Sequence, residues 1–357
     1  MPSSRLSPSA AGVGRRAILR ALLAAGLSPL VSGGARAADT PDIRFFRIGT
    51  GATSGTYFPL GGEIANLLSN PPGGRDCAHG GSCGVPGVIA VAQASQGSVE
   101  NVESVAKGTV ESALCQADVA ALAYAGTGFF DKQAPFHSLR ALASLYSESI
   151  HIVVRADSAI KSLKDLKGKR VSLGEPESGT LVDARLVLTA AGLAEKDLKP
   201  NFTKLALACD GLRDGSVDGF FQIAGYPVPA IRELASTVPL RILSVPEDAI
   251  GKLKKKFGFF TQDAIPAGTY PGIDDDVVTV GIGAEWITTT SLENDFAYLL
   301  VKALWNANSR RILDSGHPIG KRILLARAAD GLAVPLHPGA EKFYREAGLA
   351  LDTAMPG

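Results

Sequence analysis

Short apolar runs that alternate with longer segments of helical period limit how this chain can fold more than any other feature. From Ile43 onward the runs have the length of buried strands, and turns containing Gly and Pro separate them from the helical segments. This alternation is typical of α/β proteins. The pattern restarts near residue 145, and 357 residues suit two domains of ordinary size. We therefore expect an α/β chain with two lobes.

The predicted elements follow from the same pattern. Strands or buried apolar runs are expected at residues 43–48, 88–92, 113–117, 150–154, 171–173, 240–245 and 277–289. Helices are expected around residues 60–68, from residue 98, over residues 181–191 and within residues 294–312. Both parts of the chain thus repeat a unit of strand, loop and helix.

Residues 1–37 have the composition of an export signal. Five arginines, among them the adjacent Arg15 and Arg16, flank an apolar run at residues 21–31, and the segment has no acidic residue. The run is too short to span a bilayer, and an A-x-A cleavage motif ends at Ala37. The arginine pair suggests the twin-arginine route, with the Sec route and a disordered basic tail as alternatives. Cleavage changes the formal charge from +1 to −4 and predicts a soluble periplasmic protein.

The four cysteines fall into two classes. Cys77 and Cys83 bracket a Gly-rich stretch that lets the chain turn back, and the periplasm is oxidising, so we expect a disulfide that contributes about 2 kcal/mol. His79 lies between them, but this spacing is not that of a zinc site. Cys115 and Cys209 lie in apolar surroundings and are interpreted as buried thiols, with a bond between them left open.

Two loops end in the tripeptide Ser-Gly-Thr just before a predicted helix. They are Ser54-Gly55-Thr56, followed by Tyr57, and Ser178-Gly179-Thr180. Each would bring backbone N–H groups and hydroxyls to a helix N-terminus, which favours anions. Two or three such contacts would support micromolar binding of a small carboxylate. Simple helix capping explains either loop equally well when it is taken alone.

Motifs for catalysis, metals and nucleotides are missing from the sequence. A formal charge of +1 argues against nucleic-acid binding. Ser54 replaces the third glycine of the dinucleotide fingerprint that Gly49 and Gly51 would begin. Neither Ser54 nor Ser178 lies in a G-x-S-x-G elbow, and the five histidines show no ligand spacing. We expect no catalytic residue, no metal and no cofactor, and hence a protein that is not an enzyme.

Six motifs, taken in order, resemble those of the TAXI family, the solute-binding proteins that serve TRAP transporters in bacterial periplasms. The segments are residues 48–61, 96–101, 116–118, 174–180, 266–272 and 334–340. Together they run through essentially the whole mature chain. Six motifs in the same order are far more specific than either Ser-Gly-Thr loop alone.

The resemblance implies a type II-like periplasmic binding fold, in which two lobes close over a ligand like a hinged clamp. Lobe 1 would comprise residues 38–146 and 244–357, and lobe 2 residues 147–243. The implied ligand is a small organic acid or amino acid of the glutamate, glutamine or C4–C5 dicarboxylate class. The implied partner is a TRAP-type membrane permease. A sensor for a membrane receptor and, more remotely, an exported enzyme on the same frame are the alternatives.

The resemblance also implies which residues contact the ligand. They are Ser54, Gly55, Thr56, Tyr57, Gln96, Ser98, Asn101, Gln116, Tyr146, Ser178, Gly179 and Thr180. The two Ser-Gly-Thr loops would meet the ligand from opposite lobes, and Tyr146 would lie near the hinge. Three of these residues have structural alternatives: Gln96 as a turn residue, Asn101 as a brace for its helix and Tyr146 as part of the core.

Overall fold

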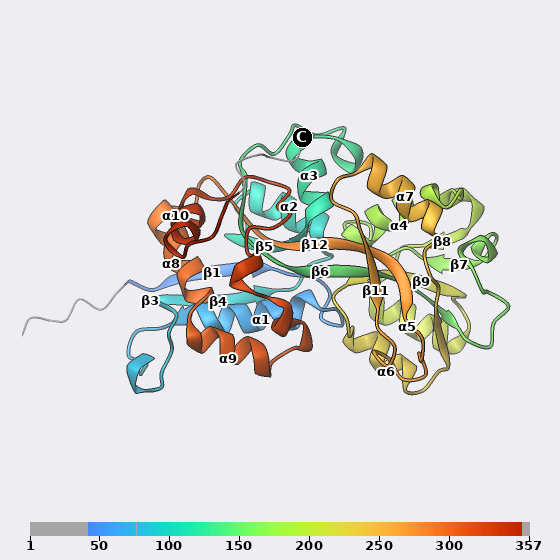
Figure 1. Ribbon diagram of the computed structural model, residues 1–357, viewed down its shortest axis with the longest axis horizontal. Coiled ribbons are helices and arrows are strands. Elements are labelled where there is room, and N and C mark those ends of the chain that lie inside the picture. Colours follow the sequence, from blue (N-terminus) through green and yellow to red (C-terminus); the bar gives the residue numbers. More distant parts are fainter. Residues whose placement is uncertain (1–41, 76, 352–357) are drawn as a thin grey trace, which may run out of the picture. The chain divides into compact units, whose positions relative to one another are not determined.

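A ten-stranded mixed sheet forms the centre of the computed structural model, which describes residues 42–75 and 77–351 (Figure 1). Its main path is β4-β1-β5-β12-β6-β9-β7-β8, with β10 beside β6 and β11 beside β12. The strands are β1 (Arg44–Gly49), β4 (Val88–Gln93), β5 (Ser112–Gln116), β6 (Leu139–Arg155), β7 (Arg170–Ser172), β8 (Lys199–Asn201), β9 (Gly219–Ala224), β10 (Leu240–Ile242), β11 (Thr261–Ile265) and β12 (Val277–Thr289). A separate parallel pair consists of β2 (Ser69–Asn70) and β3 (Val85–Pro86). The predicted export signal, with its cleavage site at Ala37, lies outside the described residues.

Helices connect most of these strands, as the α/β prediction requires. They are α1 (Tyr57–Leu68), α2 (Ser98–Ala106), α3 (Ala117–Ala125), α4 (Gly179–Ala190), α5 (Leu205–Asp214), α6 (Pro229–Ala235), α7 (Glu247–Lys256), α8 (Asn294–Leu304), α9 (Ala307–Ser315) and α10 (Pro338–Glu346). The predicted α/β class is confirmed. The amphipathic stretch expected at 294–312 is two helices, because Asn306 begins a new one and its side chain accepts a hydrogen bond from the Ser309 backbone N–H.

Three parallel strands, β1, β4 and β5, form the first group of the sheet. Helices cover both of its faces, because alternate residues of a strand point to opposite sides. On β5, Leu114 packs in the cluster that contains α1, whereas Ala113 and Cys115 pack in the cluster that contains α2 and α3. The strands predicted at 43–48, 88–92 and 113–117 are confirmed to within one residue.

The second group of parallel strands is β7, β8 and β9. Here Phe221 of β9 packs in the cluster that contains α4, and its neighbour Phe220 packs with α5. Both side chains are nearly inaccessible to water, with 2% and 0% of their surface exposed. The same alternation therefore places helices on the two faces of this group as well.

Two long antiparallel strands, β6 and β12, join the two groups (Figure 1). The first part of β6 pairs with β12, from Leu139 opposite Thr289 to Ser149 opposite Gly281, and its last residues pair with β9. The register between β6 and β12 shifts at Ala284/Glu285. The predicted apolar run at 150–154 is thus the last part of a much longer strand. The full strand was not predicted, because polar residues at its centre interrupt the apolar pattern.

The segment after residue 243 packs with the second group before the chain reaches β12. Leu253 of α7 belongs to the same buried cluster as Leu188 of α4, and Ile265 of β11 packs with Phe220. The lobe boundary at 243 stays a prediction. These contacts favour a boundary later in the sequence, close to the start of β12, as the point where the chain returns to the first group of strands.

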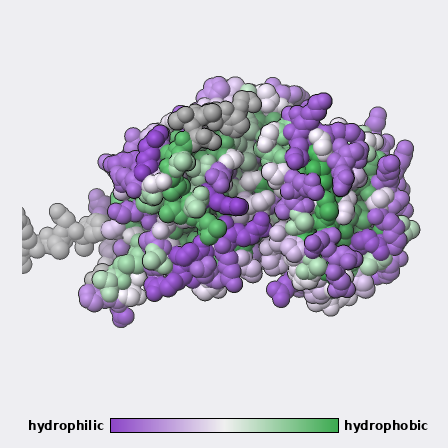
Figure 2. Space-filling model, viewed as in Figure 1, coloured by the Kyte–Doolittle hydropathy of each residue, from purple (hydrophilic) through white to green (hydrophobic). Residues whose placement is uncertain are grey.

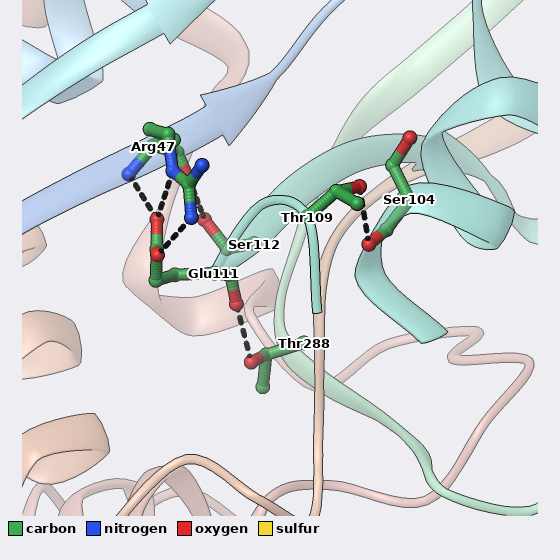
Figure 3. A network of polar contacts seen from close by, with 6 residues as sticks. All are labelled: Arg47, Ser104, Thr109, Glu111, Ser112 and Thr288. Atoms are coloured by element: carbon green, nitrogen blue, oxygen red, sulfur yellow. Dashed lines mark hydrogen bonds and ion pairs between the residues drawn. The ribbon is translucent and has the colours of Figure 1, made fainter. Parts of the chain in front are cut away.

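An ion pair ties β1 to the start of β5 (Figure 3). The Arg47 guanidinium donates to both carboxylate oxygens of Glu111, with the shorter N···O distance at 2.6 Å, and the Arg47 backbone N–H donates to the same carboxylate. The Glu111 carbonyl in turn accepts from Thr288 on β12 at 2.8 Å. Glu111 therefore links three neighbouring strands near the amino end of β5, through its carboxylate to β1 and through its backbone carbonyl to β12.

The cysteines behave as their surroundings predicted. Cys77 and Cys83 form a disulfide with a Cα–Cα distance of 4.7 Å, whereas Cys115 and Cys209 are free and buried. On the face drawn in Figure 2, polar residues surround smaller apolar patches. Across residues 42–75 and 77–351, helices long and apolar enough for a membrane span are lacking.

Candidate functional site

A pocket lies where the carboxyl ends of both groups of parallel strands meet. Open α/β sheets bind ligands in this position because the loops there leave backbone groups unpaired. The space between atoms is about 620 Å³ and is in part open to solvent. We define two walls. The first wall is formed by segments 51–57 and 96–98, which follow β1 and β4, and by Gln116 at the end of β5. The second wall is formed by segments 172–180, 203–208 and 221–224, which belong to or follow β7, β8 and β9. Some residues within these segments, such as Ser54 and Lys204, do not line the pocket.

The first Ser-Gly-Thr loop reaches across to other parts of the site. The Thr56 hydroxyl donates to the Gly225 carbonyl at 2.8 Å, and the Tyr57 hydroxyl donates to Glu148 Oε2 at 2.8 Å. The side chain of Thr56, the N-cap residue of α1, accepts no hydrogen bond from the helix backbone. Gly55, Thr56 and Tyr57 line the pocket, whereas Ser54 is half-buried beside it and is not among the lining residues.

The second Ser-Gly-Thr loop is bonded mainly within its own wall. The Ser178 hydroxyl accepts from the Leu181 backbone N–H at 3.2 Å and donates to the Glu175 carbonyl at 2.7 Å. The Thr180 hydroxyl accepts from the Ile223 backbone N–H at 3.3 Å. All three residues of the tripeptide line the pocket. Ser178 is the N-cap of α4, so capping and pocket lining occur in the same residue.

Direct contacts join the two walls at one edge of the pocket. Gln96 Nε2 donates to Glu177 Oε2 at 3.2 Å, and Gln116 Nε2 donates to Asp183 Oδ2 at 2.6 Å. Gly179 lies so close to the Gln116 side chain that a Cβ atom there would stand 1.5 Å from Gln116 Oε1. A glycine is therefore required for this approach of the walls.

Ser98 and Gln116 form a small network on the first wall. The Ser98 hydroxyl donates to Gln116 Oε1 at 3.1 Å and accepts from the Gln116 backbone N–H at 3.2 Å. Both residues line the pocket and are almost fully buried. The two bonds hold the Gln116 amide in the orientation in which its nitrogen reaches the second wall.

Two other predicted residues have partners that do not involve the pocket space. Asn101 braces two loops, because Nδ2 donates to the carbonyls of Thr50 and Leu114 and Oδ1 accepts from the Ser95 hydroxyl. It is not among the lining residues, and its structural alternative accounts for these contacts. Tyr146 is also absent from the lining and is 6% exposed. A ligand role for either residue stays a prediction.

Two glutamates in the pocket were missed by the reading of the sequence. Glu148 lies at the centre of β6 and Glu175 lies in the loop before α4. Burial raises the pKa of Glu148 to about 8, against the opposing effect of the hydrogen bond from Tyr57. Burial also raises the pKa of Glu175 to about 7, with Lys204 acting in the opposite direction. The position of Glu148 as a single acidic residue between two apolar runs is the sequence signal that could have identified it as a candidate site residue.

Basic side chains do not contribute to the pocket lining as the described residues form it. Polar contacts to a ligand would come from backbone N–H groups at α1, α2 and α4, from hydroxyls and amides, and from the two glutamates. Groups of three or more histidine, cysteine or acidic residues suited to a metal ion do not occur within 42–75 and 77–351. The arrangement is chemically suited to hydrogen-bond a small polar molecule.

The comparisons place the chain among known proteins. The sequence profile of the NMT1-like family matches residues 48–348, from β1 to beyond α10. Among solved structures, the chain is similar to the alkanesulfonate-binding protein SsuA from Xanthomonas axonopodis pv. citri bound to MOPS, with 16% identity, 85% of this chain and 84% of that chain covered, and a TM-score of 0.44. It is also similar to a protein from Bordetella bronchiseptica RB50, with 17% identity, 87% and 85% covered, and a TM-score of 0.47. An ancestral arginine-binding protein bound to arginine matches at 14% identity, with 76% and 98% covered and a TM-score of 0.44.

Proposed function

Because the chain belongs to the NMT1-like family, whose profile spans residues 48–348, we propose that it is a periplasmic solute-binding protein of a bacterial transport system. The observation that carries this proposal is the pocket at the carboxyl ends of two groups of parallel strands, where two walls contribute backbone N–H groups, hydroxyls and amides. Such a site binds and releases a solute. It would supply affinity and selectivity rather than catalysis.

The transport system in this proposal is of the TRAP type, and the chain is a TAXI subunit that delivers its solute to a membrane permease. The support is the ordered series of six motifs, four of which lie in or next to the pocket walls: residues 48–61, 96–101, 116–118 and 174–180. The alternative partner is a membrane receptor that reads the same ligand-bound state as a signal. A permease gene beside the gene for this protein would favour transport, and a sensor kinase gene would favour signalling.

The ligand in this proposal is a small amino acid or organic acid. Backbone N–H groups at the N-termini of α1, α2 and α4 suit one carboxylate. Glu148 and Glu175 suit a group that donates hydrogen bonds, such as an ammonium or an amide. Within the glutamate, glutamine and dicarboxylate class, this distribution favours an amino acid over a dicarboxylate. A second carboxylate would meet the two glutamates, and among the described residues that line the pocket there is no basic side chain, since Lys204 acts on Glu175 from outside the lining.

Binding would bring the two walls together around the solute. Contacts with both walls stabilise the joined arrangement relative to a separated one, and a ligand shifts the population by its difference in affinity for the two. The walls follow the order of the chain, with the first in the predicted lobe 1 and the second in the predicted lobe 2. The permease would then recognise the joined arrangement.

Native mass spectrometry followed by calorimetry tests the proposal. Gently purified protein should carry a small molecule, and titration with L-glutamate, L-glutamine, succinate and 2-oxoglutarate should give micromolar binding of at least one, about −8 kcal/mol. We expect the amino acids to bind more tightly than the dicarboxylates. Failure of all four, together with no co-purified solute, would contradict the proposed function. Tighter binding of succinate would contradict only the assigned ligand class.

A further inference from the structure

One carboxylate oxygen of the pocket lacks a hydrogen-bond donor. Glu175 lies in the loop before α4 and belongs to the lining of the second wall, with 8% of its surface exposed. Its Oε1 atom is buried and accepts no hydrogen bond from the residues that the structure describes. Buried polar atoms of native proteins nearly always have a partner, because an unpartnered atom has lost its hydration without compensation. This oxygen therefore indicates a donor that the described residues do not supply.

The backbone of Glu175 is fixed, so the position from which its side chain extends is defined. The Glu175 carbonyl accepts from the Ser178 backbone N–H at 3.1 Å and from the Ser178 hydroxyl at 2.7 Å. Ser178 is in turn the N-cap of α4, where its hydroxyl accepts from the Leu181 backbone N–H. The carboxyl group thus extends from a turn that is bonded to the first turn of a helix.

The other glutamate of the pocket differs in this respect. Glu148 Oε2 accepts from the Tyr57 hydroxyl at 2.8 Å, and neither carboxylate oxygen of Glu148 is buried without a partner among the described residues. The causes of the two pKa shifts agree with this geometry. The hydrogen bond from Tyr57 opposes the effect of burial on the pKa of Glu148, whereas at Glu175 the charge of Lys204, an exposed residue outside the lining, opposes it. Glu175 is thus the pocket carboxylate with an oxygen available to a solute.

Many of the donors that line the pocket already have protein acceptors. In the lining as the described residues form it, each of the three side-chain amides donates to another protein group, and these amides belong to Gln96, Gln116 and Gln222. Four hydroxyls of the lining also donate to other acceptors, namely those of Thr56, Tyr57, Ser98 and Ser178. A solute is therefore the source of a donor that this arrangement favours for Glu175 Oε1.

We propose that Glu175 accepts the ammonium group of the bound solute and so selects an amino acid over the 2-oxo acid with the same carbon skeleton. The inference rests on the proposed binding function and deepens it, because it assigns the selection to one residue. An ammonium group carries three donors and a positive charge, and the described lining has no basic side chain that would compete with it. A 2-oxo acid has a carbonyl oxygen in place of this group and would leave Glu175 Oε1 without a donor. A site built around a donor rejects an analogue that lacks it.

Calorimetry at pH 8 with a matched pair of solutes tests the selection, because Glu175, with its pKa of about 7, is mainly ionised there. L-Glutamate and 2-oxoglutarate share two carboxylates and differ at the carbon that carries the ammonium group. The unchanged protein should bind L-glutamate at least tenfold more tightly than 2-oxoglutarate. Glu175→Gln should lower this ratio at least tenfold, because the amide is uncharged and its nitrogen can donate to the 2-oxo group. Where the protein prefers a different amino acid, that amino acid and its own 2-oxo acid form the pair.

Two further variants separate selection from a structural role. Glu175→Ala should lower the ratio in the same way, and it replaces Glu175→Gln if that variant does not fold. Glu233→Gln makes the same change of charge at an exposed position of α6 outside the pocket lining, and it should keep the ratio within twofold.

The outcomes distinguish this inference from the function on which it rests. A ratio below tenfold in the unchanged protein overturns the role of Glu175. So does a ratio that falls less than tenfold in both Glu175 variants, since a structural role would weaken both solutes equally. In these cases the solute-binding function stands. If no solute binds and none is found with the purified protein, the function and the inference are both contradicted.

Discussion

The tripeptide Ser-Gly-Thr occurs once on each wall of the pocket, and the structure uses its two copies differently. On the first wall, the N-cap of α1 is Thr56, whose hydroxyl makes no capping bond and donates to the Gly225 carbonyl instead. On the second wall, Ser178 caps α4 and also bonds to the Glu175 carbonyl. The same three residues thus anchor a loop to a neighbouring segment in one case and begin a helix in the other.

The two glycines differ in the same way. Beside Gly55 an added Cβ would meet the Ala52 carbonyl oxygen at 3.4 Å, which is an ordinary contact. Beside Gly179 an added Cβ would overlap the Gln116 side chain, which is held by Ser98 and Asp183. The tripeptide alone therefore does not predict the structural role of its loop, because that role depends on which residues of the opposite wall contact it.

Substitution of the two glycines gives the largest expected contrast. Gly179→Ala should weaken solute binding at least a hundredfold, about 3 kcal/mol, because the methyl group displaces Gln116 and keeps the walls apart. Gly55→Ala should change the affinity by less than twofold. Calorimetry with the solute found by native mass spectrometry measures both. Equal effects of the two substitutions would show that the loops are equivalent after all.

The pH dependence of stability should separate the two pocket glutamates next. The pKa of Glu148, which accepts a hydrogen bond from Tyr57 of the first wall, is raised to about 8. The pKa of Glu175, which precedes the second tripeptide, is raised to about 7. Both values lie above the pKa of about 4.3 of a Glu in the unfolded chain. The folded state then binds more protons than the unfolded state between these limits. Each group therefore lowers the free energy of unfolding as pH rises through that window.

Replacement by glutamine should remove these contributions. Between pH 5 and pH 8, we expect Glu148→Gln to lessen the loss of stability by about 2 kcal/mol, and Glu175→Gln by about 1 kcal/mol because the pKa of Glu175 is raised less. Urea unfolding at both pH values measures the difference. Asp157→Asn on the exposed surface is the control and should leave the pH profile of the wild-type protein nearly unchanged. A larger effect of Glu175→Gln than of Glu148→Gln would show that the pKa of Glu175 is raised more than that of Glu148, which would contradict this prediction.

The two serines should give the smallest contrast. Ser178→Ala removes the N-cap of α4 and should lower the free energy of unfolding by about 1 kcal/mol. Ser54 lies two residues before Thr56, the N-cap of α1, so Ser54→Ala leaves the N-cap residue unchanged and should stay within about 0.5 kcal/mol of the wild type. Thermal unfolding followed by circular dichroism resolves the two. If Ser178→Ala changed solute affinity without changing stability, the capping bond would matter less than its contact with the ligand.

The regular elements of the fold were largely predictable. Strands near β1, β4 and β5 and the helix after Ser178 follow from apolar runs, helical spacing and Gly or Pro stops. The full length of β6 was not predictable in this way, because Ser147, Glu148 and Ser149 interrupt its apolar pattern. Their burial depends on partners such as Tyr57, which is far away in the sequence.

The sequence predicted which loops form the candidate site but not which of their side chains are hydrogen-bonded to each other. Nine of the twelve expected residues line the pocket: Gly55, Thr56, Tyr57, Gln96, Ser98, Gln116, Ser178, Gly179 and Thr180. Their roles as ligand contacts stay predictions. Glu148 and Glu175 were missed, and Asn101 has bonds that brace two loops instead. The sequence had no means of showing which hydroxyls and amides are already occupied by other protein groups.

By itself, the sequence determined the α/β alternation, the Cys77–Cys83 disulfide and the position of two glycine-bearing loops before helices. These features depend on neighbours within a few residues, where local conformational preferences act. Only the tertiary structure decided that Gln116 meets Asp183 and that Glu148 is buried. The charge state of a carboxyl group depends on solvent access and on groups brought close by folding, and neither is encoded in the spacing of residues along the chain.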